Sequence, residues 1–244
     1  MGSARERLAQ ISHHFLSEEE ETVATPPAPS VTSLIISHAP GYESALSPAE
    51  LAAALCRHGA TAVIIAPGAS RDDVSLHVPW HGENRTDAMT PPDAFKDLRS
   101  LLENDARNSR RFVLSTHRGE DATGVTGSQC LMLVQAHHEG LREGYGRLKA
   151  LVSKGRPALL GVIVCDAASS KSSRYHYHKL ATAAQRFLGI RIISYGALAT
   201  TPSPWAAGES LAPKREERIH HIASMLIQDW QAYQQSLNEE RIPT

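Results

Sequence analysis

Residues 31–37, Val31-Thr32-Ser33-Leu34-Ile35-Ile36-Ser37, decide the fold of this chain. A short apolar run rich in β-branched residues predicts a strand that is buried on both faces. Further runs of this kind follow at 62–66, 111–116, 130–135, 159–165 and 191–194. Helical patterns separate them or follow them at 48–57, 92–107, 141–153, 175–188 and 214–237. This alternation predicts a three-layer α/β/α domain over residues 31–244, with a mainly parallel sheet and crossover helices.

Turn and capping residues mark the boundaries between these elements. Ser47-Pro48 with Glu50 has the pattern of a helix start, because Ser caps, Pro suits the first turn and Glu completes a capping box. Residues 69–92 are polar and rich in turn formers, which predicts an excursion over the surface. Ser169-Ser170-Lys171 is interpreted as a loop before the helix at 175–188.

The first 30 residues differ in composition from the rest of the chain. Residues 1–17 carry Leu8, Ile11 and Phe15 at helical spacing, which predicts a short amphipathic helix. Residues 18–30 hold four consecutive Glu and then a Pro-rich stretch, a composition typical of an extended linker. The tethered helix either frays as a terminus or docks its apolar face into a groove of a partner.

The segment after the first strand lacks the chemistry of a phosphate loop. Such a loop needs closely spaced glycines, whose N–H groups cradle phosphate, and a Lys that neutralises it. Residues 38–48 contain one Gly, two Pro and Glu43, but no Lys or Arg. The order of strands and helices is therefore that of a nucleotide-binding protein, while the phosphate-binding residues are missing.

The composition excludes several classes of protein. The chain has 244 residues with 41% hydrophobic content, enough for one sizeable core, and a formal net charge of −1, which gives no overall attraction to nucleic acid. Three isolated cysteines fit a reducing compartment, and no run approaches the roughly 20 apolar residues of a membrane span. We expect a cytoplasmic protein that neither binds nucleic acid nor inserts stably into a membrane.

Residues 112–196 resemble the later half of MinD/ParA-type deviant-Walker ATPases, within the SIMIBI group of P-loop proteins. The branch that controls flagellar number (FleN, also called FlhG) is most similar. Three stretches carry the resemblance: the strand Leu131-Met132-Leu133-Val134, the strand Gly161-Val162-Ile163-Val164, and the helix end Arg186-Phe187-Leu188-Gly189 followed by Ile193-Ser194-Tyr195-Gly196. The resemblance implies a bacterial protein with a MinD/ParA-like fold.

The chain departs from that family where the family contacts nucleotide. The glycines and lysines of the phosphate loop have no counterpart, and Ala66-Pro67-Gly68 replaces the usual Asp-x-Asp after the second strand. Ser115 stands where the switch Asp is found, and Asp166 stands where the adenine-side Asn is found. The resemblance therefore implies a degenerate member without a Walker A motif, a pseudo-ATPase that uses no cofactor. Any dimer of this chain would form without nucleotide.

On this interpretation the chain regulates or positions a bacterial envelope or surface machine of flagellar, pilus or exopolysaccharide type. It would act by binding a protein partner, for which a homologous ATPase or GTPase is a candidate. The predicted partner-binding residues are Leu8, Ile11 and Phe15 of the tethered helix, with Trp80 and Arg85 of the 69–92 segment, because exposed Trp and Arg are common interface anchors.

Two alternatives remain open at the level of sequence. His38, His117 and Asp166 each follow a strand, so they could meet at the carboxyl edge of the sheet as acid and base or as zinc ligands. The incidental alternative is that some of 13 histidines begin loops by chance, and we predict no metal site. The other alternative is an ATPase with an unconventional phosphate loop. Cys165 is a low-ranking nucleophile candidate, and the helix 214–237 is expected to pack in the core or at a dimer contact.

Overall fold

The computed structural model describes residues 31–39, 45–67, 74–77, 110–118, 129–155, 157–200 and 211–240. The expected tethered helix (1–17), linker (18–30) and helix 92–107 lie outside the described residues, as do Trp80 and Arg85.

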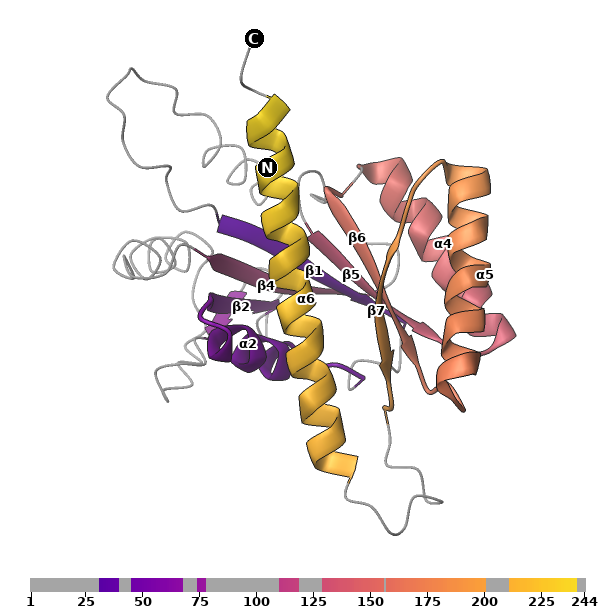
Figure 1. Ribbon diagram of the computed structural model, residues 1–244, viewed down its shortest axis with the longest axis horizontal. Coiled ribbons are helices and arrows are strands. Elements are labelled where there is room, and N and C mark those ends of the chain that lie inside the picture. The colour runs from indigo at the N-terminus through magenta and orange to yellow at the C-terminus, as the bar shows by residue number, and fades with distance from the viewer. Residues whose placement is uncertain are drawn as a thin grey trace.

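The described strands form one seven-stranded sheet of order β3-β2-β4-β1-β5-β6-β7 (Figure 1). All neighbouring pairs are parallel except β2 with β3. The strands are β1 (Val31–His38), β2 (Thr61–Pro67), β3 (Val74–His77), β4 (Arg111–Arg118), β5 (Gln129–Gln135), β6 (Leu159–Cys165) and β7 (Ile193–Leu198). The predicted mainly parallel sheet is therefore confirmed.

Helices cover both faces of this sheet. They are α2 (Pro48–Arg57), α4 (His138–Lys154), α5 (Ser170–Leu188) and α6 (Leu211–Glu240). Figure 1 shows α6 crossing one face beside α2, while α4 and α5 lie together over the other end of the sheet. The three-layer α/β/α prediction is confirmed. None of the helices in the described part of the chain is both long and apolar enough to cross a bilayer.

Two hydrophobic clusters fill the space between the layers. Along β1, Leu34 and Ile36 belong to the cluster under α2 and α6, whereas Ile35 belongs to the cluster under α4 and α5. This split follows from the period of two along a strand. The long α6 contributes a buried stripe of Ile219, Ile222, Ala223, Leu226, Ile227 and Trp230. The prediction that the last helix packs in the core is confirmed.

Two local predictions were wrong, and one short strand was not predicted. The 69–92 segment contains the strand β3, whose four residues are too few to stand out in the sequence. Residues 170–171 are helical, because the Ser169 hydroxyl accepts from the Ser172 N–H at 3.1 Å and caps α5. The last strand is Ile193–Leu198 rather than 191–194. Glycine is unfavourable inside a strand. Gly196 nevertheless lies inside β7 with φ of 90°, near an irregularity in the β6–β7 pairing.

A tight contact between β6 and β7 requires a glycine. The ring of Tyr195 lies over Gly161, so that a Cβ at residue 161 would be 1.9 Å from Tyr195 Cε2. Tyr195 has no room to withdraw, because it is 1% exposed and its hydroxyl accepts from Gln129 Nε2 at 3.2 Å. The absence of a side chain at Gly161 therefore allows this tyrosine to pack flat on the sheet beneath α6.

We expect Gly161→Ala to lower the free energy of unfolding by about 1–3 kcal/mol, the usual cost of overpacking a core. Urea unfolding followed by circular dichroism would measure it. Gly146 is the matched control, since it lies within α4 and a Cβ there would meet nothing within 4 Å. Gly146→Ala should raise stability by roughly 0.5–1 kcal/mol through helix propensity. Equal effects of the two substitutions would contradict the contact.

Candidate functional site

The carboxyl edge of the sheet is the natural place for a site, because open parallel sheets bind ligands outside the ends of their strands. One guanidinium, that of Arg215 at the start of α6, ties several elements together there. It donates to the carbonyls of Ala45 at 3.0 Å and Ala199 at 2.7 Å. It also donates to both oxygens of Glu50, at 3.2 and 3.0 Å. We call this set of contacts the Arg215 bridge.

The helix that follows β1 has its N-terminus closed by its own side chains. The Ser47 N–H donates to Glu50 Oε2 at 3.0 Å, and the Ser47 hydroxyl accepts from the Ala49 N–H at 3.2 Å. Pro48, in the first turn, has no N–H to offer. A helix N-terminus binds anions through free N–H groups and a positive field. Here a carboxylate of the helix itself occupies that position.

Burial and hydrogen bonding have opposite effects on the pKa of Glu50. Partial burial favours the neutral acid, but the hydrogen bonds from Arg215 and from the Ser47 N–H, together with the charge of Arg215, outweigh it. They hold the pKa of Glu50 below its ordinary value of 4.5. The pair is partly open to solvent, with side chains 40% exposed for Glu50 and 26% for Arg215. The carboxylate at the start of α2 is therefore ionised at neutral pH.

Asp166 follows β6 and is also engaged within the chain. Its two carboxylate oxygens accept from the Thr200 N–H at 2.7 Å and from the Thr200 hydroxyl at 2.6 Å. Its own N–H donates to the Leu198 carbonyl at 2.9 Å. The backbone has φ of 56°, a left-handed conformation that Asp tolerates better than most residues. These bonds fasten the turn after β6 to the chain leaving β7.

The strand register places His38 and Asp166 apart. Ser37 pairs with Met132 and Leu133 pairs with Ile163, so His38 lies level with Ile163, two strands away and three residues before Asp166. Strand geometry then puts their Cα atoms about 14 Å apart. His38 is 4% exposed, and its Nδ1 lies 3.2 Å from the Ala39 carbonyl oxygen.

The strand register alone places His117, the third member of the proposed set. In the pairing of β1 with β4, His117 is opposite Ser37, and Arg118 is opposite His38. The side chain of His117 lies outside the described residues. Within those residues, no three His, Cys, Asp or Glu side chains are close enough to hold one metal ion.

The thiol of Cys165 lies under the same edge but is 1% exposed. Burial, reinforced by the charge of Asp166, raises the pKa of Cys165 to about 12. Burial likewise raises the pKa of Cys130, on β5, to about 12. At such a pKa the nucleophilic thiolate is scarce at neutral pH.

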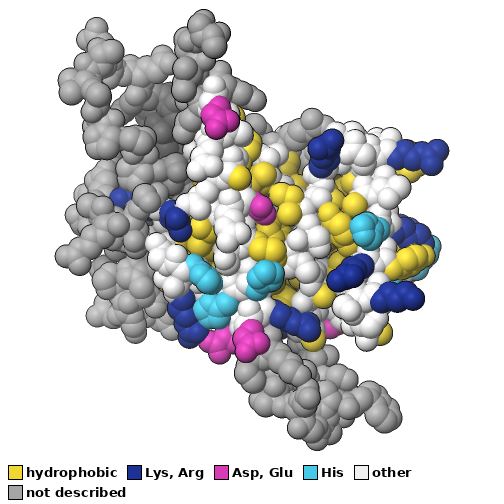
Figure 2. Space-filling view, viewed as in Figure 1, with side chains coloured by type: hydrophobic (Ala, Val, Ile, Leu, Met, Phe, Trp, Pro, Cys, Tyr) yellow, Lys and Arg dark blue, Asp and Glu magenta, His cyan; other side chains and the backbone are white. Residues whose placement is uncertain are grey.

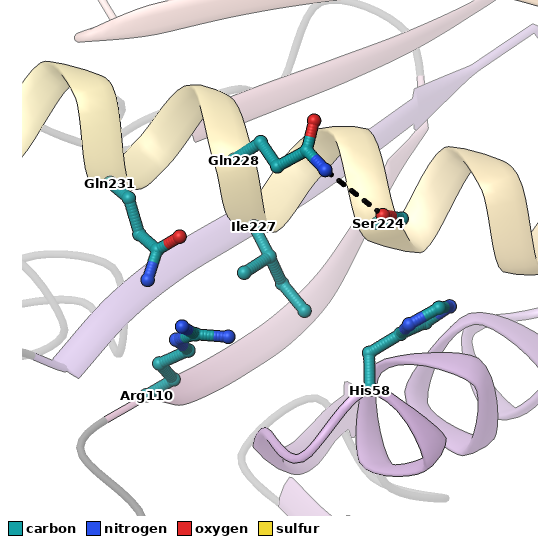
Figure 3. Close-up of a pocket in the computed structure, with 6 residues that line it drawn as sticks. All are labelled: His58, Arg110, Ser224, Ile227, Gln228 and Gln231. Carbon is teal, nitrogen blue, oxygen red and sulfur yellow. Dashed lines mark hydrogen bonds between the residues drawn. The ribbon is translucent and has the colours of Figure 1, made fainter.

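A second feature, at the opposite edge of the sheet, is a hollow of about 250 Å³ (Figure 3). It is lined by His58, Arg110, Ser224, Ile227, Gln228 and Gln231. Figure 3 shows Arg110 and Gln231 pointing toward each other. With the amide oxygen turned to Arg110, Gln231 accepts from its Nε at 2.8 Å and its Nη2 at 2.6 Å. This charged group therefore already has a partner in α6.

Beside the hollow, α2 and α6 share a polar network. Arg57 pairs with Glu216 and lies 2.8 Å from His220 Nε2. His58 Nε2 lies 3.0 Å from the carbonyl oxygen of His220, and the two imidazole rings meet edge to face. In Figure 2 one group of histidines lies beside acidic and basic side chains near the crossing of the two helices, while other histidines lie on the right of the molecule. The network joins the two helices, and its polar groups are bonded to one another. The carboxyl edge of the sheet is therefore the candidate site.

Sequence reasoning found Glu50 but not its partner. Arg215 is 165 residues away along the chain and lies in a segment with other basic residues, so no local spacing singles it out. Thr200 gave no signal either, since it is one of several Thr and Ser between the last strand and the last helix.

Comparison with known proteins supports the fold. No protein-family model matches the sequence, and the comparison with curated proteins gives no match. Among solved structures, the MinD cell division protein of Aquifex aeolicus is similar with a TM-score of 0.50 and 15% identity, over 80% of this chain and 97% of that chain. This chain therefore has a MinD-like fold. At this identity the likeness concerns the fold alone.

Removing the charge of Glu50 should destabilise the fold in a pH-dependent way. We expect Glu50→Gln, which retains an oxygen for the cap, to cost about 0.5–1 kcal/mol at pH 7. Because the folded pKa lies below 4.5, this contribution is present above pH 4.5 and is lost as the pH falls through the lowered pKa. Unfolding of both proteins by urea between pH 3 and pH 7 would measure it.

Glu139 is the matched control for this experiment. It lies in the first turn of α4 and pairs with Arg142 of the same helix at 3.3 Å, so it faces a similar helix dipole without bridging to another element. Glu139→Gln should cost no more than about 0.3 kcal/mol. If the two variants lost the same stability at pH 7, the Arg215 bridge would contribute nothing beyond a local helix effect.

Thiol labelling should separate the three cysteines. In the native protein at pH 8, iodoacetamide should modify the half-buried Cys56 and leave Cys130 and Cys165 unmodified, since about 1 in 10⁴ of a thiol with a pKa near 12 is ionised. Mass spectrometry of tryptic peptides gives the order, with urea-unfolded protein as the control for full labelling. Modification of Cys165 ahead of Cys56 would revive its candidacy as a nucleophile.

Proposed function

We propose that this chain is a non-hydrolysing MinD/ParA-like protein that acts by binding. It regulates or positions a bacterial envelope or surface machine through a protein partner. Residues 31–244 form its α/β domain, and residues 1–17 form a helix carried on the linker 18–30. The role is that of a scaffold or adaptor, in which the fold of a nucleotide switch holds binding surfaces in place.

The observation that carries this proposal is the closed start of α2. In a phosphate-binding protein of this architecture, the helix after the first strand directs free N–H groups and a positive field at the phosphates. Here Glu50 lies at that position, bonded to the Ser47 N–H and to Arg215. A phosphate group at this place would meet a carboxylate. Among the described side chains, Arg215 is the cation that contacts Glu50, and Glu50 and two backbone carbonyls already use its donors.

The state of Asp166 supports the same proposal. This residue stands where the resembling family has an adenine-side Asn. Both of its oxygens accept hydrogen bonds from Thr200, and it offers no amide donor to a base. Two positions that would serve nucleotide in an active relative thus serve the stability of the edge in this chain. This arrangement supports a role in binding a protein partner rather than in hydrolysing nucleotide.

Nucleotide binding is the first test. Isothermal titration of the full chain with ATP, ADP and GTP in magnesium should give no binding at concentrations up to about 1 mM. Metal analysis of the same sample should be run beside it. Micromolar affinity for any of the three nucleotides would contradict the proposal and make residues 38–48 a new phosphate loop. Stoichiometric zinc would instead favour an enzyme that uses His38, His117 and Asp166.

Partner capture is the second arm of the same test. The full chain carrying Leu8→Ala, Ile11→Ala and Phe15→Ala should recover its partner from a bacterial lysate at least tenfold less than the wild type. The matched control changes Gln10 and His13, on the other face of the expected helix, to Ala and should retain the partner. Trp80→Ala with Arg85→Ala tests the second predicted surface. If none of these variants loses a partner, the assigned surfaces are wrong.

A further inference from the structure

The outer surface of α5 is strongly basic. Residues 170–191 contain no Asp or Glu. They contain five exposed cations: Lys171, Arg174, Lys179, Arg186 and Arg191. None of the five forms an ion pair with a residue in the described part of the chain. The formal net charge of the protein is −1, so this surface is a local concentration of positive charge. We call it the α5 basic face.

Two large apolar side chains lie exposed within this face. Tyr175 is 60% exposed and Phe187 is 66% exposed. Each is covered by a cation, with Lys179 Nζ 5.6 Å from the Tyr175 ring centre and the Arg186 guanidinium 5.4 Å from that of Phe187. In Figure 2, Lys and Arg side chains gather on the right of the molecule, where α4 and α5 lie. Exposed aromatic rings beside unpaired cations are typical of interaction surfaces.

The core does not need this face. The opposite side of α5 supplies the buried residues Ser173, Leu180 and Ala184, which pack on the sheet. The Tyr177 hydroxyl, also on the inner side, donates to the Ile192 carbonyl at 2.7 Å. On the neighbouring α4, Glu139 is paired with Arg142 of its own helix. The α5 basic face therefore lacks a partner of opposite charge within the described residues.

We propose that the α5 basic face is the docking site for the acidic run Glu18-Glu19-Glu20-Glu21 of the same chain. This run is the longest series of carboxylates in the sequence and lies in the segment that precedes the sheet. Four consecutive negative charges complement five cations that have no ion pair within the described part of the chain. The proposal adds a second interaction surface to the partner-binding role and does not depend on whether nucleotide binds.

The chain is long enough to make this contact. Nine residues lie between Glu21 and Val31, where β1 begins, and an extended chain over these ten Cα–Cα steps spans about 33 Å. Because α5 connects the carboxyl end of β6 to the amino end of β7, its last turn lies at the edge where β1 begins. Three strand spacings and one layer separate the two points, a distance of about 17 Å.

Carbodiimide cross-linking of the full chain tests the contact. The reagent joins a carboxylate to an amine without a spacer, so docking should give peptides in which Glu18–Glu21 are linked to Lys179. Lys149 is the matched control, an exposed lysine on α4 over the same face of the sheet. We expect the Lys179 product to exceed the Lys149 product at least fivefold at low salt. At 1 M salt, where the Debye length is about 3 Å, this excess should disappear.

Equal linkage to Lys149 and Lys179 would overturn the proposal, because it would mean that the acidic run meets any lysine within reach. Cross-linking a mixture of light and heavy isotope-labelled protein identifies the chain that supplies the run. Products within one chain support the proposal. Products that join light and heavy copies would overturn it in favour of docking onto a second copy.

Competition provides an independent measurement. A fluorescent peptide of residues 15–28 should bind at least tenfold more tightly to the full chain with all four Glu changed to Gln than to the wild type, whose own run occupies the face. Adding Lys179→Glu to the quadruple variant should abolish this binding, whereas adding Lys149→Glu should not. Equal peptide affinity for the wild type and the quadruple variant would overturn the proposal. A DNA duplex gives a further test. The proposal would also be overturned if such a duplex bound the wild type and the quadruple variant with equal affinity and the peptide displaced it from neither protein.

Discussion

The Arg215 bridge is the contact on which the geometry of the carboxyl edge depends. One guanidinium, partly shielded from water, joins α6 to Ala45 in the segment before α2, to the carboxylate in the first turn of α2, and to the chain leaving β7. Each contact alone would be a weak surface interaction. A planar fork with several fixed acceptors is more specific, because its donors are satisfied only when all the segments are in place. The bridge therefore couples the last helix to the first half of the sheet.

The bridge orders this edge with charges that belong to the chain itself. In proteins whose edge is organised by a bound phosphate, the ligand supplies charge that orders the surrounding segments. Here Glu50 supplies negative charge at the start of α2, and Arg215 supplies the positive charge that balances it. The Asp166 turn is held differently, because the neutral Thr200 donates hydrogen bonds to that carboxylate from its N–H and its hydroxyl. At the start of α2, the charges that order the edge therefore come from the chain itself.

The alternation of apolar runs and helical patterns was sufficient to predict the layers and the parallel sheet, and Ser47-Pro48 with Glu50 predicted the start of α2. The sequence did not reveal β3, the extension of β7 past Gly196, or the helical state of Ser170 and Lys171. Each of these depends on pairing or capping that a short stretch of sequence does not determine. The Arg215 bridge could not be predicted, because its partners are brought together by the sheet order alone. The placement of His38 two strands from Asp166 likewise followed only from the register.

The end of β7 has a consequence for assembly. As the last strand of the sheet, β7 has an outer edge to which another strand could add. Two successive outward carbonyls of this stretch, those of Ala197 and Ala199, accept from Arg218 at 3.4 Å and Arg215 at 2.7 Å. An incoming strand would have to displace two arginines of α6 to form its ladder. Contacts within the chain therefore oppose the addition of a strand at this end of β7, and the sheets of two copies should not join there into a continuous fibre.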